Sequence, residues 1–501
     1  MAQALFSENS DGLSNRAIGQ FSPASAGGAN CANGTDAPAS VNPWDFVLML
    51  EGAALYASAA VKRLETAEPG RLAFPFCVRS TGAGYASNAA GDESDARAEL
   101  WLPLWSAAAT LAEIRALLGE GRALVGRRAA RDGLEFTRAI VSLGVDRGLR
   151  EFQRYGFLLR NGLAYFATPL DRLVVRRDAE AADLLSDFGP WLDAFRRAAR
   201  GDRAPSRVAT ACRNLERALF ALCTRRIGGQ AAADSVLAVF LQLGACEAAL
   251  AASLRWTLEQ HRLPPLQLTH PAWLLAAAAA APHETALAVA LASLQEPHLR
   301  LHLEPVEAGG NWWDEQSNEV TWIPGRPIDS LLATLLRRLV LTERKGTAVN
   351  PLRGTVAAPL PSLARLVEGR LDEALFESLL AAAACFRPEA LAAAASLPPV
   401  PATDDPAPSA LFALLRAALS GRLPDGTEVP RVTAIVRRAA ARDGREATRL
   451  AARRLRASGF APAFAEIDQR GDSVRRSAAA LLFPLADHDL GELFRQLQPL
   501  S

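Results

Sequence analysis

Apolar residues recur every three or four positions along most of the chain, which is the spacing of one face of an α-helix. The first such face follows Asn42-Pro43 and continues through Phe46, Leu50 and Leu55. Asn caps helices well and Pro fits the first helical turn, so a helix is predicted to start there. The same period predicts helices within 110–155, a succession of helices from 179 to 294, and further helices at 328–341 and 362–386.

A two-residue alternation of apolar and polar positions replaces this period in a few short segments, and such alternation is typical of a β-strand. It predicts a strand at 71–79, a small hairpin within 157–175, and a second hairpin formed by 297–305 and 318–323. In 297–305 the leucines are expected on one face, with His298, Arg300 and His302 on the other. The predicted fold class is therefore mainly α with small antiparallel β-hairpins (α+β), arranged as a multi-helix body plus a C-terminal helical bundle.

Composition along the chain suggests four parts. Residues 1–43 form a Gly/Ser/Asn-rich stretch that is too polar to bury a core, so a flexible arm is predicted. Residues 44–396 are expected to form a mostly helical body with small β elements. The Pro-rich segment 397–408 is predicted to be a linker, and 409–501 a basic C-terminal helical unit.

The charge is almost balanced overall, with a formal net charge of +1, but it is unevenly distributed. Residues 409–501 hold 15 arginines and 10 acidic residues, so this part alone carries +5 and the rest of the chain −4. Lys62 and Lys345 are the only lysines beside 53 arginines. Codon usage in a GC-rich genome produces such a bias, so an arginine needs an informative position before it is given a function.

Several classes of protein are not supported by the sequence. The N-terminal residues contain no basic segment followed by an apolar one, so no signal peptide is expected. The longest apolar run, 272–281, is too short to span a bilayer. Six cysteines lie far apart without a CxxC pair, which favours free thiols in a cytoplasmic protein. No cofactor is predicted.

The strongest local signal is a series of arginines between 431 and 456. Six of them recur at steps of 4, 3, 4, 4 and 3, which predicts one helical stripe; they are Arg438, Arg442, Arg445, Arg449, Arg453 and Arg456. A stripe of guanidinium groups can neutralise consecutive phosphates of a nucleic acid. The alternative is a solvated helix face, and Asp443-Gly444 is also a candidate helix break.

A second basic cluster contains Arg122, Arg127, Arg128 and Arg131. The two regions share the pattern RDGxExTR, at residues 131–138 and 442–449. One match of eight residues in an arginine-rich chain is weak evidence for a repeat, so we interpret it as a coincidence.

Candidate catalytic chemistry is sparse. His298 and His302 lie four apart, but the zinc-protease pattern needs a Glu after the first histidine and Leu299 stands there. Asp487-His488-Asp489 resembles part of an HD-type metal nuclease without the additional ligands. The chain has no phosphate-binding loop, dinucleotide fingerprint or nucleophile elbow. No catalytic or metal-ligating residue is therefore predicted, and Trp312-Trp313 are expected to close the edge of a core rather than to stack on bases.

Several longer strings then resemble a known family in their order along 17–501. They are NPWDFVLMLEG at 42–52, AFPFCVR at 73–79, GAGY at 82–85, ELWLPLW at 99–105, FQRYGFLLRNGL at 152–163, TWIPG at 321–325 and LAARRLRASG at 450–459. Together they resemble the large subunit of the type I-G (formerly I-U) CRISPR–Cas effector complex, Cascade.

The resemblance implies a non-catalytic subunit of a crRNA-guided complex in antiviral defence. Such a subunit contacts target DNA, supports recognition of the flanking motif and R-loop formation, and recruits the separate helicase-nuclease. The implied partners are crRNA-bearing backbone subunits, target DNA and the helicase-nuclease, with no membrane. Family members are longer at the N-terminus, so the chain is expected to lack an N-terminal domain.

In the string at 152–163, Arg154, Arg160 and Asn161 are candidates for DNA contact, because Arg and Asn suit base edges and phosphates. Two other functions stay open. One is a metal-dependent nuclease that uses His298, His302 or His488 with Asp489. The other is a helical scaffold without nucleic-acid contact.

Overall fold

A computed structural model gives the fold of the chain. It describes residues 43–58, 61–62, 72–73, 76–79, 98–120, 123–145, 148–160, 164–225, 230–260, 262–345, 350–392, 397–401 and 408–498. The predicted arm lies outside these residues except for Pro43. The chain forms two compact units, one of Met1–Ala182 with Leu219–Arg225 and one of Asp183–Ala218 with Arg226–Ser501.

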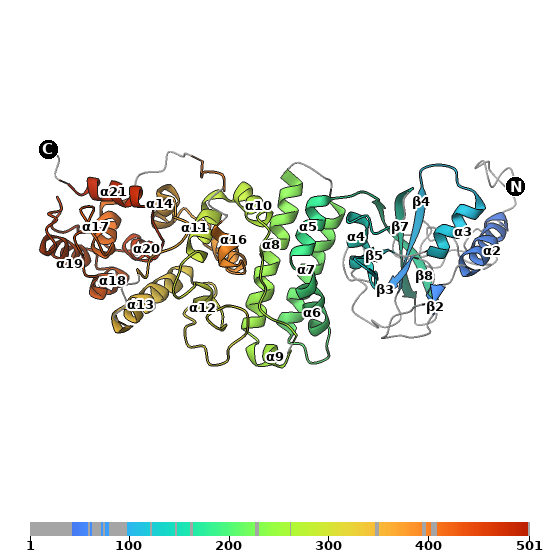
Figure 1. The fold of residues 1–501 in the computed structure, drawn as a ribbon, viewed down its shortest axis with the longest axis horizontal. Helices are drawn as coiled ribbons and strands as arrows, with labels where there is room; N and C mark the ends of the chain where they lie inside the picture. The colour runs from blue at the N-terminus through green and yellow to red at the C-terminus, as the bar shows by residue number, and fades with distance from the viewer. Residues whose placement is uncertain are drawn as a thin grey trace. The chain divides into compact units, whose positions relative to one another are not determined.

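The first unit is built on an antiparallel sheet with strand order β3-β4-β7-β8 (Figure 1). The strands are β3 Cys77–Arg79, β4 Ala98–Trp105, β7 Leu149–Arg160 and β8 Ala164–Val174. Trp101 of β4 stacks on Phe136, with ring centroids 4.3 Å apart, and Phe152 of β7 meets the same ring edge-on. These aromatic side chains form the core that holds the sheet.

Short elements surround this sheet within the first unit. They are α2 Pro43–Ser58, β1 Val61–Lys62 paired with β2 Leu72–Ala73, α3 Leu111–Glu120, β5 Leu124–Val125 paired with β6 Arg128–Ala129, and α4 Gly133–Val141. Helix α5 Ala179–Asp187 starts in this unit, and the last turns of α7 Ser206–Thr224 belong to it as well.

The sequence located one hairpin of this sheet but extended the preceding helices too far. The hairpin predicted within 157–175 is confirmed as part of β7 and β8. Residues 149–155, predicted to be helical, are instead in β7. The physical reason is a period of two, because Phe152, Arg154 and Gly156 are buried and the residues between them are more exposed.

The second unit is helical in its described residues. Its first helices are the end of α5, α6 Gly189–Ala199, the first turns of α7, α8 Gln230–Ala251, α9 Leu254–Glu259, α10 Ala272–Ala280, α11 Pro282–Ala292 and α12 Arg300–Leu303. The next are α13 Pro327–Lys345, α14 Leu360–Glu368, α15 Glu373–Ala383 and α16 Pro388–Ala392. The fold class predicted from the sequence, mainly α with small antiparallel β elements, is thus confirmed.

Helix α8 is the centre of this helical packing. It contacts α10 and α15, and a Cβ placed on Gly244 would lie 2.6 Å from the backbone nitrogen of Ala382, so only glycine allows this approach. Residues Ala232–Ala251 are long and apolar enough to cross a membrane by length and composition alone. Packing against α10 and α15 accounts for that apolar composition.

The second hairpin predicted from the sequence is wrong. Residues 300–303 form α12, and 318–323 have no regular secondary structure and lie outside any strand of the described residues. Leu299, Leu301 and His302 are all buried, so this segment is enclosed on more than one side. An alternating pattern predicts a strand only where the polar positions face water.

The C-terminal helices do not form the separate unit that the sequence suggested at the Pro-rich segment. They are α17 Ala410–Leu419, α18 Thr433–Ala440, α19 Gly444–Ala457, α20 Asp472–Ala480 and α21 Asp487–Gln496. Helix α20 packs on α13 and α14, with ion pairs from Arg475 to Asp329 and from Arg476 to Glu373. The boundary at 397–408 is therefore not a domain boundary, because these contacts join both sides of it into one unit.

Candidate nucleic-acid interface

The arginines of 438–456 lie on two helices rather than on one stripe. Helix α18 ends at Ala440, and Arg442 takes the left-handed conformation with φ 65°. Helix α19 then begins at Gly444, where a Cβ would lie 2.3 Å from the carbonyl oxygen of Gln469. The single stripe predicted from the spacing is corrected accordingly, whereas the break predicted at Asp443-Gly444 is confirmed.

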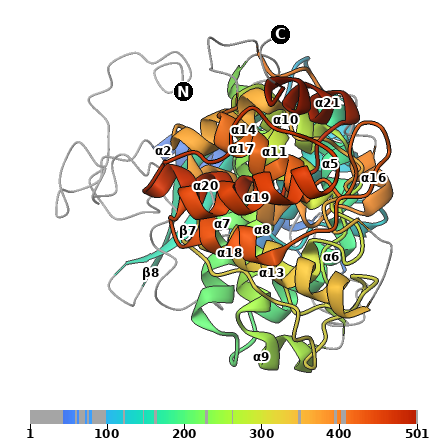
Figure 2. The same cartoon turned by 90° about the vertical axis from the view of Figure 1, so that its left-hand side faces the viewer.

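The predicted arginines are nevertheless all exposed. Figure 2 shows α18 and α19 on the side of the second unit that faces the viewer. Exposed side chains include Arg438, Arg442, Arg445, Arg449, Arg453 and Arg456. The buried face of the same helices is apolar, formed by Ile435, Val436, Ala447, Ala451 and Leu455. Amphipathic packing therefore fixes the direction of the arginines.

Half of these arginines have an acidic partner. Arg442 lies 2.8 Å from Asp472, Arg445 lies 2.8 Å from Glu466, and Arg449 pairs with Glu446 one turn earlier. Ion pairs as exposed as these contribute about 0–1 kcal/mol and exchange readily.

Arg438, Arg453 and Arg456 form no ion pair within the described part of the chain. Sequence reasoning missed Arg437, which is also exposed next to Arg438. The signal for it was the lack of any acidic residue in 431–440, which leaves Arg437 and Arg438 without an acidic residue within four positions in the sequence. We call Arg437 together with the six predicted arginines the arginine surface.

The second basic cluster does not present all its charges to solvent. Arg128 is half-buried and makes a two-point ion pair with Glu135, with nitrogen–oxygen distances of 2.5 and 3.0 Å. It is therefore corrected from a DNA contact to a structural residue. Arg127 and Arg131 are exposed, and Arg122 lies outside the described residues.

The shared pattern RDGxExTR proves to be a helix-start motif. Asp132 caps α4 by accepting a hydrogen bond from the backbone of Glu135, and Asp443 caps α19 in the same way from Glu446. The threonine of each copy, Thr137 or Thr448, bonds back to a carbonyl of its first turn. The recurrence thus reflects capping chemistry, which selects Asp at the N-cap and Glu three residues later.

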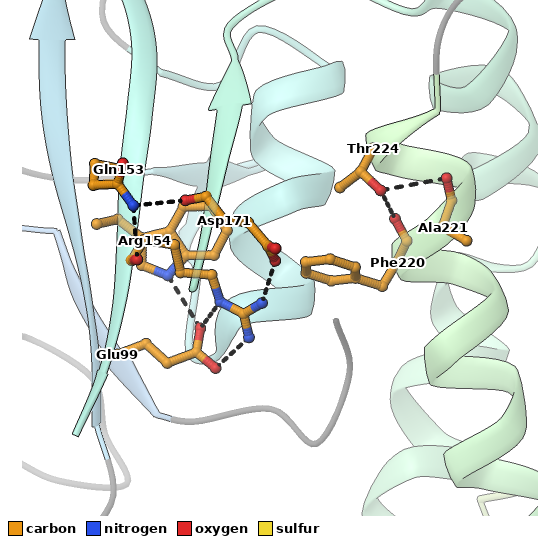
Figure 3. Close-up of polar contacts among 8 residues, drawn as sticks. Glu99, Gln153, Arg154, Asp171, Phe220, Ala221 and Thr224 are labelled. Atoms are coloured by element: carbon orange, nitrogen blue, oxygen red, sulfur yellow. Dashed lines mark hydrogen bonds and ion pairs between the residues drawn. The ribbon is translucent and has the colours of Figure 1, made fainter. Parts of the chain in front are cut away.

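Arg154 is wholly internal, which corrects its assignment as a DNA contact. Figure 3 shows its guanidinium between Glu99 and Asp171. Its Nε and Nη2 donate to the two oxygens of Glu99 at 2.8 and 2.7 Å, and Nη1 donates to Asp171 at 3.1 Å. The ring of Phe220, from the end of α7, lies 4.9 Å from the guanidinium carbon. With 1% of its surface exposed, this side chain cannot reach a base.

The other two candidates of that string are not tested by the described side chains. Arg160 is the last residue of β7, and Asn161 lies outside the described residues.

The histidines do not assemble a metal centre in the described part of the chain. His302 is buried on α12 with Nδ1 3.0 Å from the carbonyl oxygen of Glu319, and burial lowers its pKa to about 4. His298 is half-buried, and His488 is exposed, with Asp489 3.3 Å away. The ligand-type atoms that do converge there belong to Glu247, Glu304 and Cys385, all buried.

That cluster is already occupied by a cation of the chain itself. Arg300 donates to Glu304 at 2.8 Å, to Glu247 at 2.7 Å and to the carbonyl of Leu266 at 2.7 Å. The guanidinium supplies the positive charge that a metal ion would otherwise bring, so the cluster is an internal ion-pair network.

The tryptophans divide between two environments. Trp313 and Trp322 are half-buried and donate to the carbonyl of Leu263 at 3.1 Å and to Glu377 at 2.8 Å. Trp312 is 60% exposed, so the edge-of-core expectation is wrong for this residue. Glu377 also accepts a hydrogen bond from the backbone N–H of Gly325 at 3.0 Å, so it holds both Trp322 and Gly325 of the segment 321–325.

The arginine surface is thus the site at which exposure, positive charge and regular spacing coincide. Comparison with known proteins adds no assignment to it, since no protein-family model matches the chain and no curated protein shows significant similarity.

Proposed function

We propose that the arginine surface binds the phosphate backbone of a nucleic acid. Three of its members, Arg438, Arg453 and Arg456, have no acidic partner among the described residues, so their positive charge is available to a ligand. Guanidinium groups match phosphate oxygens with two parallel donors and carry their charge at any physiological pH.

The observation that carries this proposal is the exposed row on α19. Arg445, Arg449, Arg453 and Arg456 follow one another at steps of four, four and three residues. With a rise of 1.5 Å per residue, the row extends over about 16 Å of helix axis. One acidic residue, Glu446, stands in this helix against five arginines, so the face attracts an extended polyanion.

The wider proposal is that the chain is the non-catalytic large subunit of a type I-G crRNA-guided effector complex. The ordered strings along 17–501 support it, and so does the absence of a recognisable catalytic motif in the sequence. In this role the chain contacts target DNA, supports recognition of the flanking motif and R-loop formation, and recruits the helicase-nuclease. Its direct partners are the crRNA-bearing backbone subunits.

The test uses the full chain co-expressed with a crRNA and the backbone subunits of the same operon. Co-purification of the subunits with crRNA is expected, and a chain that purifies alone contradicts the wider proposal. Binding of target DNA is then measured from 50 to 300 mM salt for the unaltered complex and for one with Arg442, Arg445, Arg449 and Arg453 changed to Glu. We expect weaker binding and a shallower dependence on salt.

A matched control separates this surface from a general loss of positive charge. Arg213, Arg217, Arg344 and Arg387 are also exposed and lie outside the arginine surface. Their change to Glu alters net charge by the same amount and is expected to leave the salt dependence near that of the unaltered complex. Equal effects of the two sets, or no effect of the first, would contradict binding at the arginine surface.

A further inference from the structure

A different pair of arginines lines a cavity in the second unit. The cavity has a volume of about 1590 Å³ and is lined by the end of α13, the segments 350–355 and 420–431, and the start of α21. Arg416, from α17, and Arg431, just before α18, both contribute to its lining.

Arg416 is a buried cation that lacks a carboxylate partner in the described residues. Its Nη1 donates to the carbonyl oxygen of Leu481 at 2.9 Å, while its Nε is buried with no hydrogen-bond partner. The side chain exposes 5% of its surface. Burying a guanidinium without a negative partner is unfavourable, so this arrangement calls for a compensating charge.

Among the described residues, Arg431 has hydrogen-bond acceptors that are all neutral. It donates to the carbonyl oxygens of Leu419 and Ser420 at 3.0 and 3.2 Å and to the side-chain oxygen of Asn350 at 2.8 Å. A Cβ on Gly421 would lie 2.4 Å from its Nη2, and Gly421 has φ +85°, so glycine is required for this approach. The backbone is thus shaped around the guanidinium.

The two cations repel each other. Burial, together with the nearby charge of Arg431, lowers the pKa of Arg416 to about 10. Burial also lowers the pKa of Arg431.

The acidic residues of the cavity lie in its exposed part. Glu296, Glu343, Glu428 and Asp487 line the cavity and are exposed, and none of them forms an ion pair with Arg416 or Arg431. The buried part of the lining is therefore positive and the exposed part predominantly negative. Such an exposed part disfavours a long polyanion more than a compact anion, because the polyanion would contact more of its carboxylates.

We propose that this cavity binds a small phosphate-bearing molecule, with Arg416 and Arg431 neutralising the phosphate dianion. Two guanidinium groups without a counter-charge among the described residues match the two negative charges of a phosphate or phosphate monoester. The volume exceeds that of a phosphate ion and leaves room for an organic remainder. This site is separate from the arginine surface and does not depend on the nucleic-acid proposal.

The proposal is tested by thermal unfolding and calorimetric titration of the full chain. The probes are inorganic phosphate, glycerol phosphate and adenosine monophosphate, with acetate at equal ionic strength as the singly charged control. We expect the phosphate probes, but not acetate, to raise the midpoint of unfolding. Tighter binding of an ester than of inorganic phosphate assigns the site to an organic phosphate, and equal binding assigns it to the free ion.

Two substitutions connect this binding to the cavity. Arg416→Met and Arg431→Met are each expected to weaken phosphate binding at least about tenfold, which corresponds to the loss of one charge-assisted contact. Arg422→Met removes an exposed arginine of the same lining and is expected to bind as the unaltered chain does.

Arg416→Met is also expected to change the thermal stability of the chain in the absence of phosphate. In phosphate-free buffer its unfolding midpoint is expected to rise, because an uncompensated buried charge is replaced by an apolar chain of similar length. A lower midpoint together with unchanged phosphate binding would show a purely structural arginine and overturn the proposal. Unchanged binding in Arg431→Met, a response to phosphate no larger than to acetate, or preferential binding of a single-stranded oligonucleotide would overturn it as well.

Discussion

The guanidinium of Arg154 and the carboxylate of Glu99 form a two-point ion pair in which neither side chain exposes more than 1% of its surface. The register of β4 and β7 sets this pair, because it places Arg154 opposite Trp101, two residues from Glu99. Trp101 also donates to Glu99 through its ring nitrogen at 3.2 Å. Glu99 and Arg154 thus stabilise the interior of the first unit and are not available to a ligand.

Arg154→Met is expected to destabilise the chain by about 3–5 kcal/mol, because it leaves the Glu99 carboxylate buried without the positive charge of the guanidinium. The additional change Glu99→Gln should recover part of this loss by removing the buried negative charge. Arg172→Met is the control, since Arg172 pairs with Glu151 at an exposed position of the same sheet and should cost less than about 1 kcal/mol. Urea unfolding measures all three, and equal losses for Arg154 and Arg172 would contradict the burial argument.

Changing Arg438, Arg453 and Arg456 together to Gln is expected to alter the free energy of unfolding by no more than about 0.5 kcal/mol, because these side chains are exposed and unpaired in the described residues. The same variant should reduce the slope of log affinity for DNA against log salt by about three, or one for each lost phosphate contact. Filter binding over a salt series provides the measurement. A full loss of affinity without a change of slope would mean that these arginines do not contact phosphates.

Substitution of two adjacent arginines on α13, Arg337 and Arg338, should lower the free energy of unfolding by very different amounts. Arg338 is buried, and its three nitrogens donate to the carbonyl oxygens of Pro351, Pro297 and Gln295. Arg338→Met leaves these carbonyls without a donor and is expected to cost about 3 kcal/mol or more. Arg337 pairs with Glu319 in a partly exposed position, so Arg337→Met should cost under about 1 kcal/mol. Similar losses in urea unfolding would refute this assignment.

Stability is expected to depend on His302 between pH 4 and 6.5. Burial lowers the pKa of His302 from its ordinary value of 6.5 to about 4 in the folded state. The unfolded chain therefore binds the extra proton over this range, so the contribution of the neutral histidine is fully present above pH 6.5 and is lost as the pH falls towards 4. A shift of this size corresponds to about 3 kcal/mol.

The measurement is urea unfolding at a series of pH values for the unaltered chain and for His302→Leu. The variant should lose most of the rise in stability between pH 4 and 6.5. The same rise in both proteins would assign it to other groups.

The two helix caps can be compared directly. Asp132→Ala and Asp443→Ala each remove an acceptor for the backbone N–H of the third helical residue and should cost about 0.5–2 kcal/mol. Asp443→Asn retains an acceptor and should cost less. Thermal unfolding of the three variants checks this, and an Asn variant as unstable as the Ala variant would contradict capping as the role of Asp443.

Secondary structure was predictable from the sequence where an element has one buried and one solvent-exposed face, because apolar and polar residues then alternate with the period of that element. The apolar face of α13 is of this kind. The prediction failed around His302, where packing encloses leucines and polar residues alike, so that the alternation carried no information about exposure. It failed for 149–155 because the spacing of buried residues there is two, although helix-forming residues dominate the composition.

The candidate site was predictable in part. Spacing placed Arg445, Arg449 and Arg453 on one exposed row, because that spacing follows the turn of a single helix. The sequence could not reveal the burial of Arg154, since its partner Glu99 lies 55 residues away and only the strand register brings them together. The cavity lined by Arg416 and Arg431 could not be predicted from the sequence either, because segments far apart in the sequence form its lining.

The buried arginines give the excess of arginine over lysine in this chain a structural role. Arg154, Arg300 and Arg338 each connect two or more acceptors that are distant from one another along the sequence. A planar guanidinium with five donors can brace such acceptors at fixed angles, whereas an ammonium group acts at one point. A version of this protein with lysine in place of arginine would keep its net charge but would lose these multi-point hydrogen bonds in its interior.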